Sequence, residues 1–176
     1  NVGPAEFHEL DETRAEKNAE GFRIVGFMKG GDDYKLDVTG TTLTGTRRVG
    51  ANLVTISGSA LIGARIVVEG PPAGTKYDIE IKGVTSQLMW QAPITPINTY
   101  ELRWGPAGSA AERPVCVNPP NREEGDGSEW ASSTEAILFT GDRYDTDALT
   151  VPSIGASPWF NVACAGTVMA KLALNR

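Results

Sequence analysis

Residues 61–84 read LIGARIVVEGPPAGTKYDIEIKGV and carry the clearest fold signal in the chain. Two runs rich in β-branched residues, 61–68 and 77–84, lie on either side of a turn-forming cluster at 69–74. This arrangement predicts a β-hairpin with a longer loop. In the second run apolar residues alternate with charged ones, so one face of that strand is expected to contact solvent.

Similar patterns on both sides of the hairpin predict further strands. Residues 22–28 are rich in aromatic and β-branched side chains, and the Gly-Gly-Asp-Asp sequence at 30–33 is typical of a turn that ends such a strand. Alternating or continuous apolar residues predict the remaining strands, at 34–38, at 100–104, in the segment that leads into Cys116, and at 136–139.

The segment from residue 38 to residue 68 repeats a short apolar-then-glycine phrase, with a glycine every fifth position from Gly40 through Gly50. One interpretation is a pentapeptide-repeat β-helix. Each coil of such a solenoid uses about twenty residues, however, and several coils must stack to be stable. The other interpretation is a set of short strands with glycine at bulges and turns, as in a curved sheet or small barrel.

The C-terminal segment has a different pattern. Ser157 and Pro158 are typical of a helix N-terminus, and the apolar residues that follow recur every fourth position, at Phe160, Cys164, Val168 and Leu172. We therefore expect a mainly β fold, in which a single curved antiparallel sheet, small barrel or sandwich carries one C-terminal helix packed on it.

The chain length of 176 residues is typical of one domain. Residues 1–21 carry many charged and few apolar side chains, which predicts a mobile arm or a poorly anchored helix. The β-rich domain is expected to cover residues 22–176. Within it, residues 118–133 are rich in Pro, Asn, Glu, Gly and Ser, which indicates an exposed loop.

The net charge of -6 disfavours nucleic acid as a partner, and Arg47-Arg48 is an isolated pair typical of a solvated strand or turn. No run approaches the roughly 20 apolar residues of a transmembrane helix. The sequence begins with Asn1 and contains two cysteines, Cys116 and Cys164. Both features favour an exported protein, secreted or at the cell surface, with the cysteines joined in a disulfide; two free thiols are the alternative.

Few residue clusters point to catalysis. His8 is the one histidine in the chain and lies in the charged segment, so a Ser-His-Asp or Cys-His site and a zinc site are disfavoured. Three carboxylates, Asp142, Asp145 and Asp147, could surround a calcium ion, but they lack the glycine placement and closing glutamate of an EF-hand loop, which favours an ordinary acidic turn. Asp32, Asp33 and Asp37 form a weaker version of the same pattern.

Trp130 lies in the polar loop and is the tryptophan most suited to contact a ligand, for example by stacking on a sugar ring. Paired carboxylates on facing walls of a cleft would make such a protein a polysaccharide hydrolase, because glycoside hydrolysis uses two such groups. Only their separation in space can test this reading.

The C-terminal half resembles a known family. A strand that ends in Pro114-Val115-Cys116, an apolar run that leads to the turn Gly141-Asp142-Arg143-Tyr144, and the stretch FNVACAGTVMAK at 160–171 are similar to the ADYC-domain proteins of bacteria. The likeness covers roughly residues 55–176, and the Ala-Asp-Tyr-Cys motif itself is absent. The resemblance implies an exported protein with Cys116 and Cys164 paired, and it implies no reaction.

These observations lead us to expect a non-catalytic extracellular or cell-surface module. It would bind a partner protein, or form a subunit of a structural assembly, through strand edges and the N-terminal arm. The alternative is a secreted hydrolase acting on polysaccharide. No cofactor is expected, apart from calcium if the three aspartates bind it.

Overall fold

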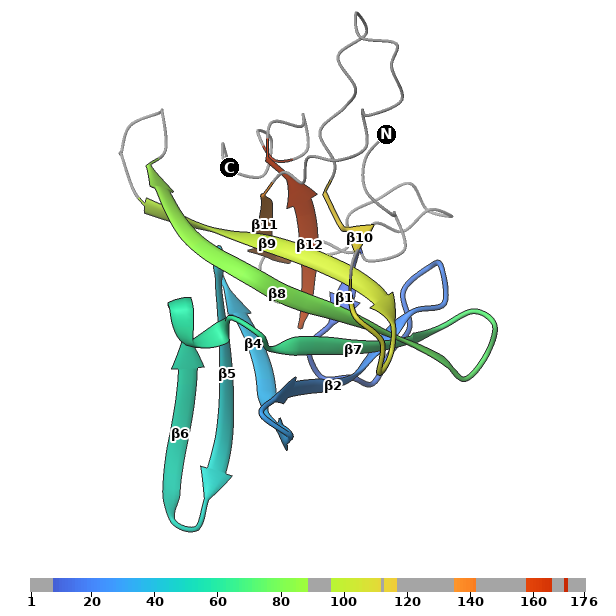
Figure 1. The fold of residues 1–176 in the computed structure, drawn as a ribbon, viewed down its shortest axis with the longest axis horizontal. Coiled ribbons are helices and arrows are strands. Elements are labelled where there is room, and N and C mark those ends of the chain that lie inside the picture. The colour runs from blue at the N-terminus through green and yellow to red at the C-terminus, as the bar shows by residue number, and fades with distance from the viewer. Residues whose placement is uncertain are drawn as a thin grey trace, which may run out of the picture.

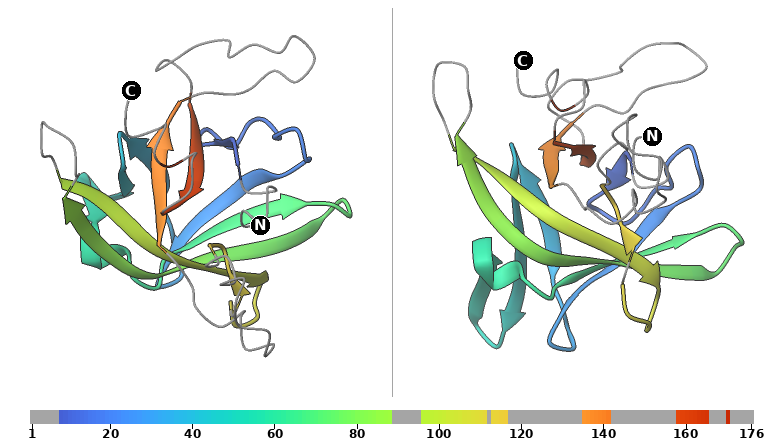
Figure 2. Two further views of the ribbon diagram at one scale, coloured as in Figure 1. Left: turned by 90° about the horizontal axis from the view of Figure 1, so that it is seen from above. Right: turned by 45° about the horizontal axis from the view of Figure 1, so that its top comes forward.

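The computed structural model describes residues 8–88, 96–111, 113–116, 135–141, 158–165 and 170. Nine antiparallel strands form one sheet in the order β1-β12-β11-β9-β8-β7-β2-β3, with β10 paired to β9. This sheet curls into a half-barrel (Figure 1 and Figure 2). The strands are β1 (Leu10–Asp11), β2 (Arg23–Lys29), β3 (Asp32–Asp33), β7 (Arg65–Gly70), β8 (Thr75–Leu88), β9 (Pro96–Pro106), β10 (Arg113–Pro114), β11 (Ala136–Thr140) and β12 (Trp159–Cys164).

A second sheet of three strands has the order β4-β5-β6, formed by β4 (Lys35–Thr39), β5 (Thr42–Val49) and β6 (Asn52–Ser57). A 3₁₀ helix, η2 (Gly58–Leu61), leads back to the large sheet. All three strands are antiparallel, so the β-helix interpretation of this segment is wrong. Gly40 and Gly50 have positive φ angles in the two tight turns between the strands, which glycine adopts without steric cost.

The predicted hairpin at 61–84 is confirmed as β7 and β8, which pair along the whole of β7. The isoleucines of both strands face the core, where Ile66, Ile79 and Ile81 are almost fully buried. The opposite face carries charges that pair across strands. Arg65 lies 3.6 Å from the Asp78 carboxylate and 3.9 Å from that of Glu80.

Two contacts fix the β5–β6 hairpin against the large sheet. The hydroxyl of Tyr100, on β9, accepts a hydrogen bond from the Leu43 backbone N–H (2.8 Å) and donates one to the Thr41 carbonyl (3.1 Å). Gly45 lies over the Phe27 ring, because a β-carbon on this glycine would come within 2.7 Å of the ring. The base of the hairpin is therefore anchored, while its far end projects away from the half-barrel (Figure 1).

The predicted C-terminal helix is wrong for residues 159–164, which form strand β12. β12 pairs with β11 along its length and with β1, so its backbone belongs to the sheet. All six of its side chains are buried. Phe160 and Cys164 lie on one face of a strand as well as on one face of a helix, because four is a multiple of the strand period of two. The helical spacing was therefore ambiguous.

The expectation of a mobile or poorly anchored arm does not hold for residues 8–21. Leu10 is 1% exposed and lies in the core, and β1 pairs with β12. The Asp11 carboxylate accepts the backbone N–H groups of Thr13, Ala15 and Glu16 at 2.8–2.9 Å. The polar side chains of this segment thus cap its own turns, and the segment covers one end of the sheet.

Candidate functional site

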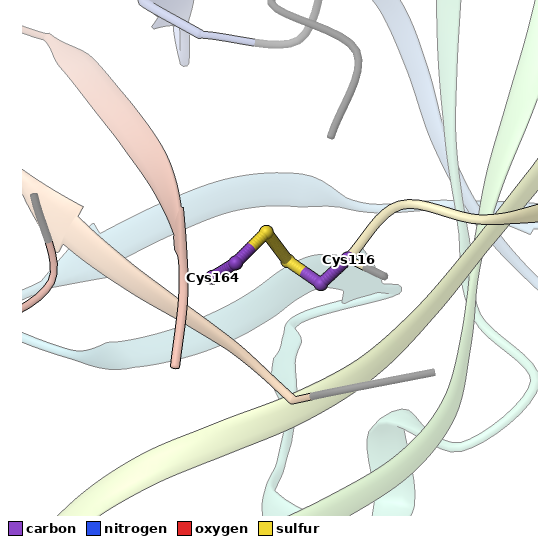
Figure 3. The surroundings of a disulfide bond; sticks show 2 residues. All are labelled: Cys116 and Cys164. Carbon is purple, nitrogen blue, oxygen red and sulfur yellow. A yellow bond between two sulfur atoms is a disulfide. The ribbon is translucent and has the colours of Figure 1, made fainter. Parts of the chain in front are cut away.

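Cys116 and Cys164 form a disulfide, as predicted, with an S–S distance of 2.06 Å (Figure 3). Cys116 follows β10, and Cys164 ends β12. Both cysteines are buried in the core. The bond closes a loop with a sequence separation of 48 residues. In the chain-entropy model such a loop stabilises the fold by about 4 kcal/mol. The site that the sequence identified most clearly is therefore structural.

The other predicted ligand positions have varied outcomes. Trp130, Asp142, Asp145 and Asp147 lie outside the described residues, so the calcium and sugar-stacking readings stay predictions. Asp32 and Asp33 are adjacent, and each forms a salt bridge with an arginine. Across the described part of the chain, no group of three or more His, Cys, Asp or Glu side chains has the arrangement of a metal site.

A groove of about 870 Å³ lies between residues 12–14, the β3–β4 region and the β5–β6 hairpin. Its lining includes four basic side chains and three carboxyl groups, together with the exposed side chain of Leu53. The basic residues are Arg14, Lys35, Arg47 and Arg48, and the acidic residues are Glu12, Asp32 and Asp33. All lining residues lie between positions 12 and 53, so the N-terminal segment and the strands β3 to β6 form the groove together.

Arg14 and Asp33 form one wall of the groove. The guanidinium binds both carboxylate oxygens, at 2.8 and 3.0 Å, and also donates to the Tyr34 carbonyl. One oxygen of Asp33 accepts the Phe27 backbone N–H at 3.0 Å as well. The Arg14 side chain lowers the pKa of Asp33 below its usual value, so this carboxylate stays ionised. Arg14 and Asp33 therefore hold each other in place, and their charges cancel.

Arg47 and Asp32 form a second ion pair in the lining of the groove. Nη2 of Arg47 lies 2.8 Å from the Asp32 carboxylate, and the guanidinium carbon lies 5.3 Å from the centre of the Tyr34 ring. Nε of Arg47 is buried and has no hydrogen-bond partner among the residues that the structure describes. A buried donor without an acceptor costs about 1–3 kcal/mol. Arg47 thus retains hydrogen-bonding capacity that the described residues do not use.

Glu12 is the carboxyl group of the groove whose pKa is raised far above its usual value. Its Oε1 accepts the Val38 backbone N–H at 3.1 Å. Burial raises the pKa of Glu12 from 4.5 to about 7, and the nearby charges of Asp37 and Asp11 add to this effect while Lys35 opposes it. Glu12 is therefore close to half protonated at neutral pH.

The β6 strand forms one side of the hairpin next to this groove, and within the described residues it pairs with β5 alone. Its side chains are exposed apart from the half-buried Ile56. The hairpin carries most of the exposed large apolar side chains found in the described part of the chain, at Val49, Leu53 and Val54, with Leu53 67% exposed. An apolar strand with an open edge is a common protein-binding element.

Sequence reasoning missed this site for a physical reason. Arg47-Arg48 looked like an isolated solvated pair, and Glu12 and Arg14 looked like part of an arm. The groove forms only when residues 12–14, 32–35, 46–48 and 53 meet in the folded chain. Two signals were available, the acidic pair Asp32-Asp33 and the run Asn52–Ser57, a β-type sequence that contains no charged residue.

A model of the ADYC domain family matches residues 58–174. The chain belongs to the ADYC domain family. No curated protein and no solved structure gives a significant match. The family match begins at Gly58, directly after β6, so it covers the disulfide and the strands from β7 onward. The β5–β6 hairpin and every residue that lines the groove precede the matched range of this ADYC protein.

Proposed function

We propose that this ADYC-domain protein is a non-catalytic module of an exported protein and that it holds a partner protein through the β5–β6 hairpin. The observation that carries the proposal is the open edge of β6. This strand has six residues, no proline, no charged residue and no register shift in its pairing with β5. A flat edge of this kind can accept another strand by backbone hydrogen bonds.

The other edges of the two sheets make β6 stand out. The large sheet ends in β1 and β3, which have two residues each. The outer edge of β4 is occupied by side chains, because Glu12 accepts the Val38 N–H and the Thr140 hydroxyl donates to the Val38 carbonyl. Short or occupied edges prevent unwanted strand pairing. The exposed edge of β6 therefore supports a binding role for that strand.

The disulfide supports an exported location, since such bonds persist in oxidising compartments. None of the helices in the described residues is long and apolar enough to cross a membrane. The intact mass of the native protein, measured without reductant, tests the location. We expect a mass two hydrogen atoms below that of the reduced chain, and a native protein with free thiols would argue against export.

A polysaccharide hydrolase is the second candidate, and Glu12 is the observation that favours it. A carboxyl group with a pKa of about 7 suits a general acid, and two further carboxylates line the same groove. Asp33 and Asp32, however, are each bound to an arginine, which suits a structural role better than nucleophilic attack. Glu12→Gln separates the candidates, since it would abolish hydrolysis and leave hairpin binding intact.

The binding test uses a partner isolated from the exported protein fraction, purified and titrated against the chain. Leu53→Lys adds a charge to the β6 edge, and Ala73→Lys adds the same charge at the exposed turn of the other hairpin. We expect Leu53→Lys to weaken binding about tenfold or more, because a strand edge with a charge pairs poorly, and Ala73→Lys to have no effect. Equal loss or equal retention in both variants would refute the proposal.

A further inference from the structure

The charges of the groove do not cancel. Arg14 is neutralised by Asp33, and Arg47 by Asp32. Arg48 and Lys35 remain, both exposed, and among the described residues neither has an ion-pair partner. The one further carboxyl group of the groove is Glu12. The lining side chains carry a net charge of +1 when Glu12 is ionised and +2 when it is protonated, and Arg48 and Lys35 are the cations next to the β6 edge that no carboxylate holds among the described residues.

Apolar surface adjoins this positive region. Arg48 on β5 is paired directly with Leu53 on β6, so the two side chains lie on the same face of the hairpin. Both line the groove. A ligand that contacts Arg48 thus also contacts an exposed leucine, and a strand added to β6 would lie beside that leucine.

Arg47 does not offer a free donor to a ligand in the groove. Its Nη2 is occupied by Asp32, and its Nε, which has no acceptor among the described residues, is buried. A carboxylate suits the exposed Arg48 and Lys35 instead, because arginine binds carboxylates through two parallel hydrogen bonds and lysine binds them as a point charge. The groove volume of about 870 Å³ is large enough for several residues of an extended peptide.

We propose that the groove binds an acidic side chain of the partner, carried on an extended apolar segment that pairs with the open edge of β6. The partner's carboxylate lies against Arg48 and Lys35, and a neighbouring apolar residue covers Leu53. This inference rests on the proposed function and adds the chemistry of the partner. It predicts an extended segment in which an acidic residue lies among β-branched residues.

Glu12 gives this binding a pH dependence. The charged groups that face it are Asp11 in its own segment, Asp37 and Lys35 on β4. When Glu12 is protonated, it does not repel the partner's carboxylate and can donate a hydrogen bond to it. Because Glu12 ionises as the pH rises through about 7, affinity should fall between pH 6 and pH 8.

The test uses three labelled peptides of alternating valine and threonine that differ at one central residue, which is aspartate, asparagine or lysine. We expect the wild-type chain to bind the aspartate peptide about tenfold more tightly than the asparagine peptide at low salt, and the lysine peptide most weakly. Arg48→Glu should remove the preference for aspartate, and Lys76→Glu, an equal charge change on the other hairpin, should keep it. Glu12→Gln should remove the pH dependence.

The outcomes separate the two proposals. If the peptides bind in a manner that Leu53→Lys abolishes, but with equal affinity for aspartate and asparagine, the hairpin binds partners and the acidic-partner inference is wrong. If no peptide binds, both proposals fail. If sedimentation shows the chain dimerising through Leu53, a second copy occupies β6 and the inference is also refuted.

Discussion

The β7–β8 hairpin and the β5–β6 hairpin follow one another in the chain but have opposite surroundings. β7 and β8 are flanked by β2 and β9, their isoleucines are buried, and the charges on their outer face are paired across strands. β6 has one neighbour and exposes its apolar side chains. Similar β-type sequences are thus enclosed by the sheet in one hairpin and exposed in the other.

The largest expected loss of stability follows removal of the disulfide, which acts on the core around the β7–β8 hairpin. Replacing both cysteines, by Cys116→Ala with Cys164→Ala, should lower the free energy of unfolding by about 4 kcal/mol, because the unfolded chain regains the freedom of the closed loop. Denaturant titration measures this change. Hydrogen exchange should accelerate strongly at β8 amides and little at β6 amides, which already exchange by local opening. Equal acceleration in both hairpins would contradict the contrast.

A core truncation sharpens the comparison. Ile81→Ala in β8 should cost about 3 kcal/mol, because this side chain is fully buried and its loss leaves a cavity. Val54→Ala in β6, which removes two methyl groups from a 36% exposed side chain, should cost less than about 0.5 kcal/mol. Thermal denaturation of the two variants would refute the comparison if their costs were equal.

The hydrogen bonds that link the β5–β6 hairpin to the large sheet through the Tyr100 hydroxyl can also be removed. Tyr100→Phe leaves the Leu43 N–H and the Thr41 carbonyl without their partner, at a cost of about 2 kcal/mol. Burial raises the pKa of Tyr100, so its hydroxyl keeps its proton at neutral pH. Tyr77→Phe is a matched control, since its hydroxyl makes a 3.2 Å bond at the exposed β7–β8 turn. An equal loss of stability in both variants would contradict this role.

The smallest effect depends on pH. The pKa of Glu12 is raised from 4.5 to about 7 in the fold, so the folded state favours the protonated form. The wild type therefore loses stability as the pH rises through that interval, whereas Glu12→Gln does not. We expect the variant's melting temperature to equal that of the wild type below pH 4.5 and to exceed it above pH 7. A difference in melting temperature between the variant and the wild type that stays constant with pH would contradict a raised pKa for Glu12.

Local patterns predicted the parts of the fold that local chemistry determines. The hairpin at 61–84 has an unambiguous turn cluster, and the disulfide followed from a count of two cysteines. The segment WFNVAC at 159–164 misled because Ser157 and Pro158 resemble a helix start and its buried positions fit both periods. The N-terminal segment misled because charged composition does not reveal that Asp11 and Asn18 accept backbone N–H groups.

Local sequence patterns could not predict the candidate site. Glu12, Asp32 and Arg47 come from three segments, and what they form depends on how the segments meet. The raised pKa of Glu12 arises from burial in the folded chain, which no neighbouring residue in the sequence specifies. The uncharged β-type sequence of β6 was visible in the sequence, but its open edge became evident only from the strand order of the described residues.

The anchored base of the β5–β6 hairpin has a mechanical consequence. Six residue pairs join β5 to β6, and the Tyr100 hydroxyl fastens the start of β5 to the large sheet. A partner strand paired along β6 would load all of its hydrogen bonds together in shear, whereas a partner attached at the tip would load its few contacts one after another. A partner strand lying along β6 would therefore grip this protein more firmly than one attached to the tip alone.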